Sequence, residues 1–322
     1  MALSDMQVFN QYLKEQTAEE LGQMIDGFNQ ASAGSILLAN QAFEGDFFER
    51  SFYSALYSSQ RRVDRYAANS AVSSTSLAEL KEAAVKVAGG FGPILWEPSQ
   101  MSWIRANEAQ AIAMISEQLA TAMMQDQLNS AIAALVAAIS NQASATNDVS
   151  ASAGVSYSAV NGAHAKFGDK SGMLVAQVMT GATYHKLIGD NLTNTPQLFQ
   201  AQNVTVVDIL GKPIVVTDAP ALYTAGTPNK AKVLSLVSGA ATIMDGSQVV
   251  TNIETSNGKG RIETTFQADY DFGVSLKGYT WDTTNGGKSP TDAELATGSN
   301  WDKVVTDIKN TAGVITIGDA DA

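Results

Sequence analysis

ANEAQAIAMISEQLATAMMQDQLNSAIAALVAAIS, residues 106–140, carries the strongest structural signal in this chain. The large apolar residues of this run recur every three to five positions, close to the helical period, and alanine, the best helix former, fills much of the rest. No glycine or proline interrupts it, so we predict one helix of about 50 Å at 1.5 Å per residue. The recurring apolar residues are Ile112, Ile115, Leu119, Met123, Leu128, Ile132, Leu135 and Ile139.

The second long element is IETTFQADYDFGVSL, residues 262–276, in which two sets of residues alternate strictly. Period-two alternation is typical of a strand with one buried face, and a run of this length would span about 50 Å at 3.3 Å per residue. Because the helix and the strand match in length, we predict that they pack side by side into a flat, elongated plate. Such a plate suits a tile in a larger assembly better than a globular enzyme. The expected inner face comprises Ile262, Thr264, Phe266, Ala268, Tyr270, Phe272, Val274 and Leu276.

The segments before the long helix predict an arm and an excursion. In residues 1–45, Thr17-Ala-Glu-Glu20 has the form of a capping box, so we expect one short amphipathic helix whose apolar stripe covers this subunit or a neighbour. Residues 46–100 mix aromatics with Ser and Arg and lack the apolar residues for a core of their own. We interpret them as a long, protruding, partly β excursion, which at that length is usually functional. The cluster Gly89-Gly90-Phe91-Gly92-Pro93 is expected to force a turn.

A polar, turn-rich stretch at residues 141–156 predicts a boundary, and a mixed α/β region follows it. In that region we predict helices at 157–167 and at 182–188, the second closed by Gly189, and strands at 173–179, 204–207, 213–216 and 232–237.

Composition excludes several classes of function. The 322 residues carry 20 Lys and Arg against 32 Asp and Glu, so a net charge of -12 argues against gripping nucleic acid through the overall field. The absence of cysteine excludes disulfides, thiolate catalysis and Cys-ligated zinc, and two histidines cannot form a His-rich metal site. No secretory signal is present, and the longest apolar stretch, 131–139, is too short for a membrane span. We therefore expect a soluble, cytoplasmic protein without cofactor, metal or membrane partner.

The motifs and residues that could take part in catalysis or ligand binding are interpreted as structural, so we expect that the protein is not an enzyme. Gly287-Lys288-Ser289 mimics the end of a phosphate-binding loop, but Asp282 stands where its first glycine should be. Asp269 and Asp271 share one strand face and are expected to be solvated or salt-bridged. His164 and His185 lack a nearby nucleophile, and the methionines at 114, 123 and 124 are expected to fill the core.

One exposed cluster is a candidate site. Arg61, Arg62 and Arg65 lie among Tyr53, Tyr57 and Tyr66 inside the predicted excursion. Arg and Tyr are enriched at protein interfaces, so we predict that these six residues form inter-subunit contacts, with the arginines clamping an acidic neighbour. A solvated loop face and a nucleic-acid contact are the alternatives.

The order of these elements resembles that of the tailed-phage major capsid proteins of the Hong Kong 97 fold. In that family an N-terminal arm, an extended loop, a long spine helix, a mixed α/β insertion and a returning β-ribbon follow one another. Three groups of stretches add to the resemblance. Phe167-Gly168-Asp169 with MLVAQVMTGATYHKLIG (173–189) is similar to the start of the axial domain, and LGKPIVVTDAP (210–220) to a Gly-Lys-Pro strand with an Asp-Pro exit. LKGYTWD (276–282), SPTDAELATGSNWDKV (289–304) and KNTAGVITI (309–317) are similar to the end of the peripheral domain.

The resemblance implies an α+β, Hong Kong 97-like capsid fold. Its parts would be the N-terminal arm at 1–45, the extended loop with flanking strands at 46–100, the peripheral domain at 101–148 and 249–322 with the spine helix at 106–140, and the axial domain at 149–248.

The implied function is that of a structural major capsid protein. Copies would assemble as pentamers and hexamers into the icosahedral head of a tailed bacteriophage, enclosing double-stranded DNA without sequence-specific binding. A charged, helical N-terminal region that could act as a built-in scaffold is missing, which implies a separate scaffolding protein beside a portal protein and, as a further candidate, a decoration protein. No lysine and asparagine match the cross-link of some relatives, so covalent cross-linking is not assumed. The protein would be made in the host cytoplasm and reside in the virion.

Three other functions stay open at this stage. An encapsulin-like nanocompartment shell would hold enzyme cargo instead of a genome, and a tail tube or fibre protein would form tubular particles. A hydrolase with an elongated substrate surface is the third, although the missing nucleophile and base argue against it.

Overall fold

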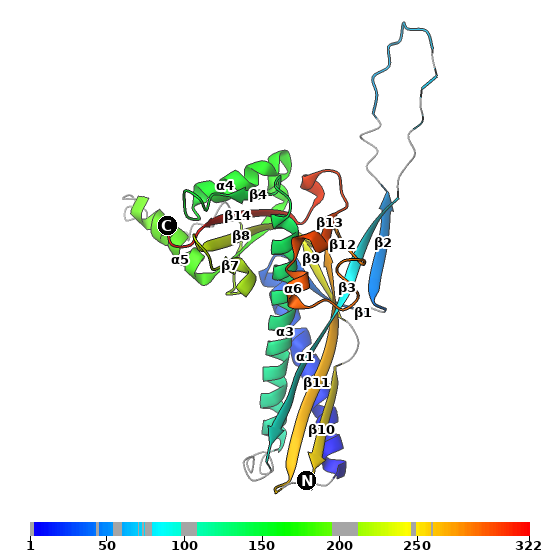
Figure 1. The fold of residues 1–322 in the computed structure, drawn as a ribbon, viewed down its shortest axis with the longest axis vertical. Coiled ribbons are helices and arrows are strands. Elements are labelled where there is room, and N and C mark those ends of the chain that lie inside the picture. Colours follow the sequence, from blue (N-terminus) through cyan, green and yellow to red (C-terminus); the bar gives the residue numbers. More distant parts are fainter. Residues whose placement is uncertain are drawn as a thin grey trace.

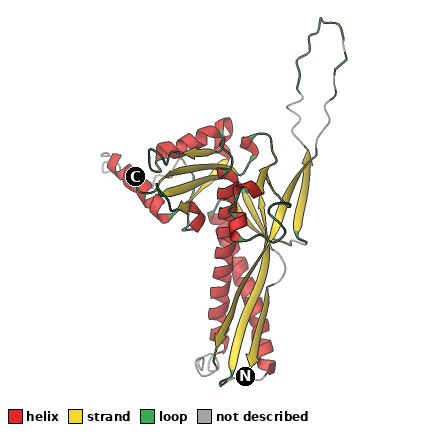
Figure 2. Ribbon diagram, in the orientation of Figure 1, coloured by secondary structure: helices red, strands yellow, loops and turns green. Residues whose placement is uncertain are grey.

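The computed structural model describes residues 3–42, 45–53, 60–69, 71–72, 74, 79–97, 108–194, 212–245, 249–258 and 260–322. Two long helices lie along one side of a long, twisted ribbon of strands (Figure 1). A second sheet with its own helices sits beside the C-terminal end of the longer helix, and a loop projects away from both (Figure 2). The predicted elongated plate of helix on ribbon is therefore confirmed.

The longer helix, α3, spans Glu108–Ser140, as its periodicity predicted; residues 106 and 107 lie outside the described part. Its buried side chains include Leu119, Met123, Ile132, Leu135 and Ile139, which belong to the main hydrophobic core. Met123 fills the core as expected, whereas Met114 is exposed.

The N-terminal helix, α1, spans Leu3–Ala31 and packs along α3. The predicted short helix beginning near Thr17 is wrong. The Thr17 hydroxyl donates a hydrogen bond to the Leu13 carbonyl 2.7 Å away, which is the back-bond of a mid-helix threonine rather than a cap. Leu13 and Ile25 are buried in the main core, so tertiary packing of this stripe extends the helix through the apparent start signal.

Strand β11, Glu263–Leu276, confirms the second long element. Its even-numbered residues from 264 to 276 are buried and its odd-numbered ones, apart from Gly273, are more exposed, as alternation predicts. Ile262 is the exception, because it precedes the strand and is exposed.

The first sheet has the strand order β1-β9-β11-β3-β2, with β10 pairing on β11. β3 runs antiparallel to both β11 and β2, so the chain between β2 and β3 forms the excursion predicted for residues 46–100. The remaining strands of this sheet are β1 (Ile36–Ala42), β2 (Phe47–Tyr53), β3 (Glu79–Trp96), β9 (Ala241–Asp245) and β10 (Val250–Ser256).

The predicted turn at Gly89–Pro93 is wrong, because these residues lie inside β3. A Cβ added to Gly89 would lie 2.7 Å from the Tyr270 ring on β11, so glycine here admits a cross-strand aromatic side chain. Gly92 has φ +102° beside a register shift in the β3–β11 ladder, so it accommodates a β-bulge instead of reversing the chain.

The second sheet has the strand order β4-β14-β8-β5-β6, with β7 on β8. The predictions for 157–167, 173–179, 213–216 and 232–237 are confirmed, and 204–207 lies outside the described residues. The helix predicted to end at Gly189 continues to Asn194. The elements are β4 (Thr146–Asp148), α4 (Tyr157–Lys166), η2 (Gly168–Met173), β5 (Leu174–Met179), α5 (Gly181–Asn194), β6 (Ile214–Val216), η4 (Pro220–Leu222), β7 (Tyr223–Thr224), β8 (Lys230–Val237) and β14 (Gly313–Asp319).

Residues 277–312 form a small unit that we call the tryptophan knob. Its strands β12 (Tyr279–Trp281) and β13 (Trp301–Lys303) pair with each other, and Trp281 and Trp301 meet edge to face with ring centroids 4.9 Å apart. Both indole N–H groups donate to backbone carbonyls, those of Gly287 and Leu295. The short helices α6 (Asp292–Leu295), η5 (Gly298–Asn300) and η6 (Ile308–Asn310) complete it.

Strand β14 follows the knob and pairs with β4 and β8 in the second sheet. The C-terminal part of the chain thus contributes to both sheets: β10 and β11 belong to the first sheet and β14 to the second.

Candidate assembly surfaces

The arginine cluster lies on the projecting loop beyond β2 and β3, away from both sheets (Figure 1). Arg61, Arg62, Arg65 and Tyr66 are all exposed, and Tyr66 retains 92% of its accessible surface. The Arg65 guanidinium lies 6.0 Å from the centroid of the Tyr66 ring. Of the other two candidates, Tyr53 is the last residue of β2, and the structure describes its backbone only. Tyr57 lies outside the described residues. The structure therefore brings the three arginines and Tyr66 onto one short, solvated segment.

The tryptophan knob holds the base of this loop. The Thr280 hydroxyl accepts a hydrogen bond from the Ala83 amide on β3, and the Glu82 carboxylate accepts one from the Gly278 amide. Lys288 forms an ion pair with Asp46, just before β2, at 3.3 Å. These contacts fasten β3 and the residue before β2, on either side of the loop, to the knob.

The outer face of the ribbon carries a shallow groove of about 400 Å³ over β3 and β11. Residues facing each other across the ladder share a face, so Gly90 and Asp269 lie together on the side opposite the helices, as do Ala88 and Asp271. The Asp269 carboxylate fills the space over Gly90, because a Cβ added there would lie 2.8 Å from Asp269 Oδ1. The exposed Val250 of β10 lines the edge of the groove.

The two groove carboxylates have different partners. Asp271 forms an ion pair with Lys86 at 2.8 Å, as the sequence interpretation of this strand face expected. Asp269 accepts hydrogen bonds from the neutral Gln267 amide at 3.0 and 3.2 Å, and its charge has no cationic partner among the described residues. The groove is therefore acidic at its centre.

On the inner face, the same ribbon is fastened to α3. The Tyr270 hydroxyl donates a hydrogen bond to the Asp126 carboxylate at 2.6 Å, and Phe91 stacks on the Tyr270 ring. Burial raises the pKa of Asp126; the bond from Tyr270 opposes this rise, and the charge of Asp292 adds to it. Burial and the Asp126 carboxylate also raise the pKa of Tyr270.

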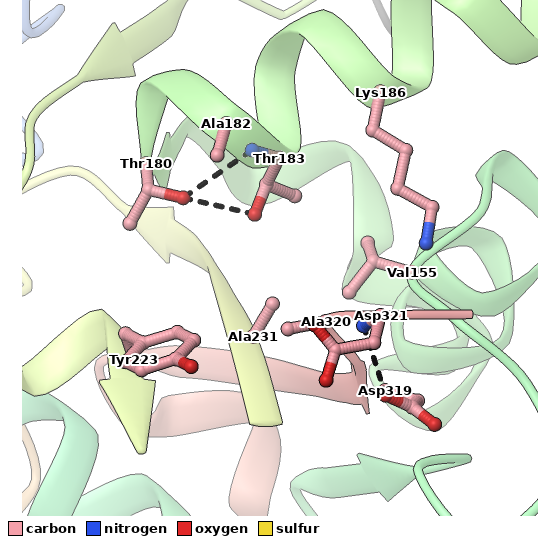
Figure 3. A pocket seen from close by; sticks show the side chains of 10 residues that line it. All are labelled: Val155, Thr180, Ala182, Thr183, Lys186, Tyr223, Ala231, Asp319, Ala320 and Asp321. Carbon is pink, nitrogen blue, oxygen red and sulfur yellow. Dashed lines mark hydrogen bonds between the residues drawn. The ribbon is translucent and has the colours of Figure 1, made fainter. Parts of the chain in front are cut away.

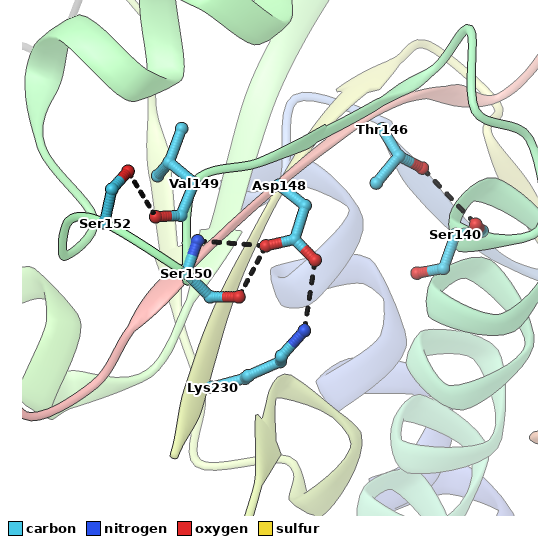
Figure 4. Close-up of polar contacts among 7 residues, drawn as sticks. All are labelled: Ser140, Thr146, Asp148, Val149, Ser150, Ser152 and Lys230. Carbon is cyan, nitrogen blue, oxygen red and sulfur yellow. Dashed lines mark hydrogen bonds and ion pairs between the residues drawn. The ribbon is translucent and has the colours of Figure 1, made fainter. Parts of the chain in front are cut away.

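Where α3 meets the second sheet, polar side chains close the helix and brace the neighbouring strands (Figure 4). The Thr146 hydroxyl lies within hydrogen-bond distance of the Ile139, Ser140 and Gln142 carbonyls, the last of them at 3.0 Å. Asp148 accepts hydrogen bonds from the amide and the hydroxyl of Ser150 and forms an ion pair with Lys230 at 3.1 Å. Partial burial works to raise the pKa of Asp148, but these bonds outweigh it and hold the pKa below its ordinary value.

A cavity of about 320 Å³ opens beside the N-terminus of α5 (Figure 3). Thr180 caps the helix by accepting a hydrogen bond from the Thr183 amide, and Lys186 lies one turn further on. On the other side Asp321 accepts a hydrogen bond from Asn229 at 2.7 Å, and Asp319 accepts one from the Asp321 amide. The cavity thus carries charges of both signs, and its two aspartates already have donors.

The two histidines lie on different helices, His164 on α4 and His185 on α5. His164 is buried and hydrogen-bonded to the Ser235 hydroxyl at 2.9 Å. Burial, together with the charge of Lys212, lowers the pKa of His164 to about 4, so the ring is neutral at pH 7. The described residues contain no group of three potential metal ligands and no helix apolar and long enough to cross a membrane.

Sequence reasoning found the arginine cluster but missed the groove. The only local signal was the Gly89-Gly90 pair, which is compatible with a turn and equally with a strand that lies close to a neighbouring strand. Only the register of β3 on β11, which sets Gly90 against Asp269, distinguishes the two.

Solved structures share this fold at low sequence identity. A chain from the structure titled "Cyanophage Pam1 capsid asymmetric unit" matches with TM-score 0.50 and 12% identity, covering 76% of this chain and 87% of that one. A chain of Mycobacterium phage Adephagia matches with TM-score 0.53 and 8% identity, covering 89% and 88%. A chain of Mycobacterium phage Cain gives TM-score 0.52 and 10% identity, with the same coverages. No curated protein matches the chain.

The helix-on-ribbon plate with its second sheet is thus a fold of tailed-phage capsid chains. By sequence, residues 5–315 match the Gp13-like family, described as major capsid protein 13-like, and the chain belongs to this family. Its role is structural, in the head of a tailed phage.

Proposed function

We propose that copies of this chain assemble as pentamers and hexamers into the closed icosahedral shell of a phage head. The observation that supports this most is the match to a major capsid family over residues 5–315, on a fold that spreads 322 residues into a plate with an extended loop. A plate exposes more surface than a globule of the same mass, and side-by-side packing in a shell would bury much of it.

The parts of the plate are assigned distinct places in this shell. The second sheet serves as the axial domain around five- and six-fold axes. Compared with the sequence-based domain 149–248, it adds β4 and β14 and leaves β9 to the first sheet. α3 and the ribbon form the wall. The loop with Arg61, Arg62 and Arg65 clamps a neighbouring subunit, and many such modest contacts add up to a stable shell.

The proposed partners follow from the same role. A separate scaffolding protein guides curvature, a portal protein occupies one vertex, and double-stranded DNA fills the interior without sequence-specific binding. The net charge of -12 supports the last point, because an acidic wall repels packed phosphates. We assign no catalytic role to the chain, and its synthesis to the host cytoplasm.

Light scattering and negative-stain microscopy test the proposal on the protein expressed alone and with its neighbouring open reading frames. Closed spherical shells, or pentamers and hexamers that convert to shells with a partner, are the expected result. A stable monomer of about 34 kDa under every condition would contradict it. Shells that co-purify with an enzyme cargo would indicate a nanocompartment instead, and tubes would indicate a tail protein.

A further inference from the structure

The dipeptide Asn-Gly occurs three times in the chain, at 161–162, 257–258 and 285–286. In this dipeptide the glycine amide nitrogen can attack the asparagine side chain, because glycine has no Cβ to hinder the approach. The attack requires that the amide loses its proton and that the backbone rotates, so a hydrogen-bonded amide in a fixed conformation reacts slowly. The three copies therefore differ in reactivity through their surroundings.

The first copy is held in a helix. Asn161 and Gly162 lie inside α4, where each interior amide donates a hydrogen bond to the carbonyl four residues earlier. The Asn147 side chain donates to the Ala159 carbonyl at 2.8 Å and lies against Gly162, since a Cβ added to that glycine would be 3.0 Å from Asn147 Nδ2. Both the proton of the Gly162 amide and the local backbone angles are therefore fixed.

A second copy is held in the tryptophan knob. The Gly286 amide donates to the Asp282 carbonyl at 2.9 Å, and the Asn285 side chain donates to the Asp282 carboxylate at 2.6 Å. Gly286 is buried against Trp281, where an added Cβ would lie 2.3 Å from the indole ring. The attacking nitrogen and the side chain that it would attack are thus both engaged with Asp282.

The remaining copy, Asn257-Gly258, follows the last residue of β10, in the turn that leads to β11. Both residues are exposed, and a Cβ added to Gly258 would meet no atom within 4 Å beyond its chain neighbours. Gly258 has φ +92°, a conformation that glycine adopts without strain. Among the described residues, neither the Gly258 amide nor the Asn257 side chain has a hydrogen-bond partner. The turn lies at the end of the ribbon that is remote from the projecting loop (Figure 1).

We propose that Asn257-Gly258 is a site of spontaneous covalent modification, at which Asn257 of the folded protein is converted into a mixture of aspartate and isoaspartate. The Gly258 nitrogen bonds to Asn257 Cγ, the Cγ–Nδ2 bond breaks, and the amide proton leaves with the side-chain nitrogen as ammonia. The product is a five-membered cyclic imide.

Water then opens the imide at either of its carbonyls. Opening at Asn257 Cγ restores the original main chain with an aspartate side chain, whereas opening at the main-chain carbonyl leaves the chain running through Cγ as isoaspartate. Water is the only co-reactant, so no other component is needed. Each event adds a carboxylate, and hence a negative charge at neutral pH, to the end of the ribbon.

The test follows the three asparagines separately over time by peptide mass spectrometry, in the folded subunit at neutral pH and in the same protein unfolded by denaturant. In the folded protein, Asn257 should gain the mass of an acid at least roughly tenfold faster than Asn161 or Asn285, because its glycine amide alone of the three lacks a hydrogen bond within the described residues. In denaturant the three rates should agree within about threefold, because those hydrogen bonds are lost. A sample digested at time zero subtracts any modification that arises during digestion.

Asn257→Gln is the matched variant, because the longer side chain would have to close a six-membered ring, which forms more slowly. Labelling of the folded protein by an isoaspartate-specific methyltransferase should fall to background in this variant and persist in Asn285→Gln. Labelling that persists in Asn257→Gln, or a rate at Asn257 no faster than at the other two asparagines of the folded protein, would overturn the proposal. Neither readout depends on shell assembly, so the result is independent of the proposed capsid function.

Discussion

The projecting loop and the tryptophan knob adjoin each other, yet they use aromatic residues in opposite ways. In the knob, Tyr279, Trp281 and Trp301 are buried, and both indole N–H groups have carbonyl partners. In the loop, Tyr66 is almost fully exposed beside three arginines. Buried aromatics stabilise the subunit itself, whereas exposed ones keep their surface for a partner. The knob's aromatics therefore stabilise the subunit, whereas the exposed loop residues are the ones that we propose to contact a neighbouring copy.

The largest expected effect separates assembly from folding. Replacing Arg61, Arg62 and Arg65 together by Glu should abolish closed shells, because the proposed clamp becomes repulsive at every subunit contact, while the free energy of unfolding stays within about 0.5 kcal/mol of wild type. Shell yield by microscopy and denaturant unfolding of the unassembled subunit measure the two quantities. Replacement of all three by Lys keeps the charge and should retain shells. Normal shells from the Glu variant would contradict a role of the three arginines in assembly.

Next comes the knob. Trp301→Ala should destabilise the subunit by about 3–5 kcal/mol, because it removes a fully buried ring and leaves a cavity against Trp281. Tyr66→Ala is the matched aromatic deletion on the loop and should change unfolding by less than about 0.5 kcal/mol. Denaturant titrations of both variants provide the test. Equal losses of unfolding free energy would show that the loop aromatic stabilises the subunit as much as the knob aromatic does.

A smaller effect is expected at the capping box of the knob. The Thr291 hydroxyl accepts from the Glu294 amide, and the Glu294 carboxylate accepts from the Thr291 amide at 2.8 Å. Thr291→Ala should therefore cost about 1 kcal/mol of unfolding free energy. Thr283→Ala, at an exposed threonine of the same unit, is the control, and a cost no greater than that of the control would argue against the cap.

The smallest effect concerns the ion pair between the knob and the base of the loop. Lys288 and Asp46 are both largely exposed, so solvent screens their attraction. Lys288→Ala should lower the unfolding free energy by less than about 0.5 kcal/mol and leave shell yield unchanged. A marked loss of shells with normal stability would instead show that this ion pair contributes to assembly and not to folding.

Local patterns predicted those elements whose signal repeats over many residues. The helix at 108–140 and the strand at 263–276 each satisfy their period over several turns or alternations, so no single contact decides them. The exposure of Arg61, Arg62 and Arg65 was predictable in the same way, because the surrounding residues cannot form a core.

Short motifs were the weak point, since the same pattern has different meanings in different surroundings. Thr17 and Glu20 have capping-box spacing but lie inside α1, whereas Thr291 and Glu294 form a real capping box with the same spacing. The packing of Leu13 against the core extends the first helix past the motif. Gly189 did not end α5 either, because a single glycine inside a helix costs only about 1 kcal/mol relative to alanine.

By itself, the sequence determined the long helix, the long strand, the elongated shape and the exposed arginine cluster, because each depends on periodicity or composition along the chain. Only the tertiary structure decided that Gly89 and Gly90 lie in a strand, that β14 returns to the second sheet, and that Asp269 borders a groove. These features depend on strand register and on contacts between residues nearly 180 positions apart, as in the pairing of Gly90 with Asp269, which no local pattern encodes.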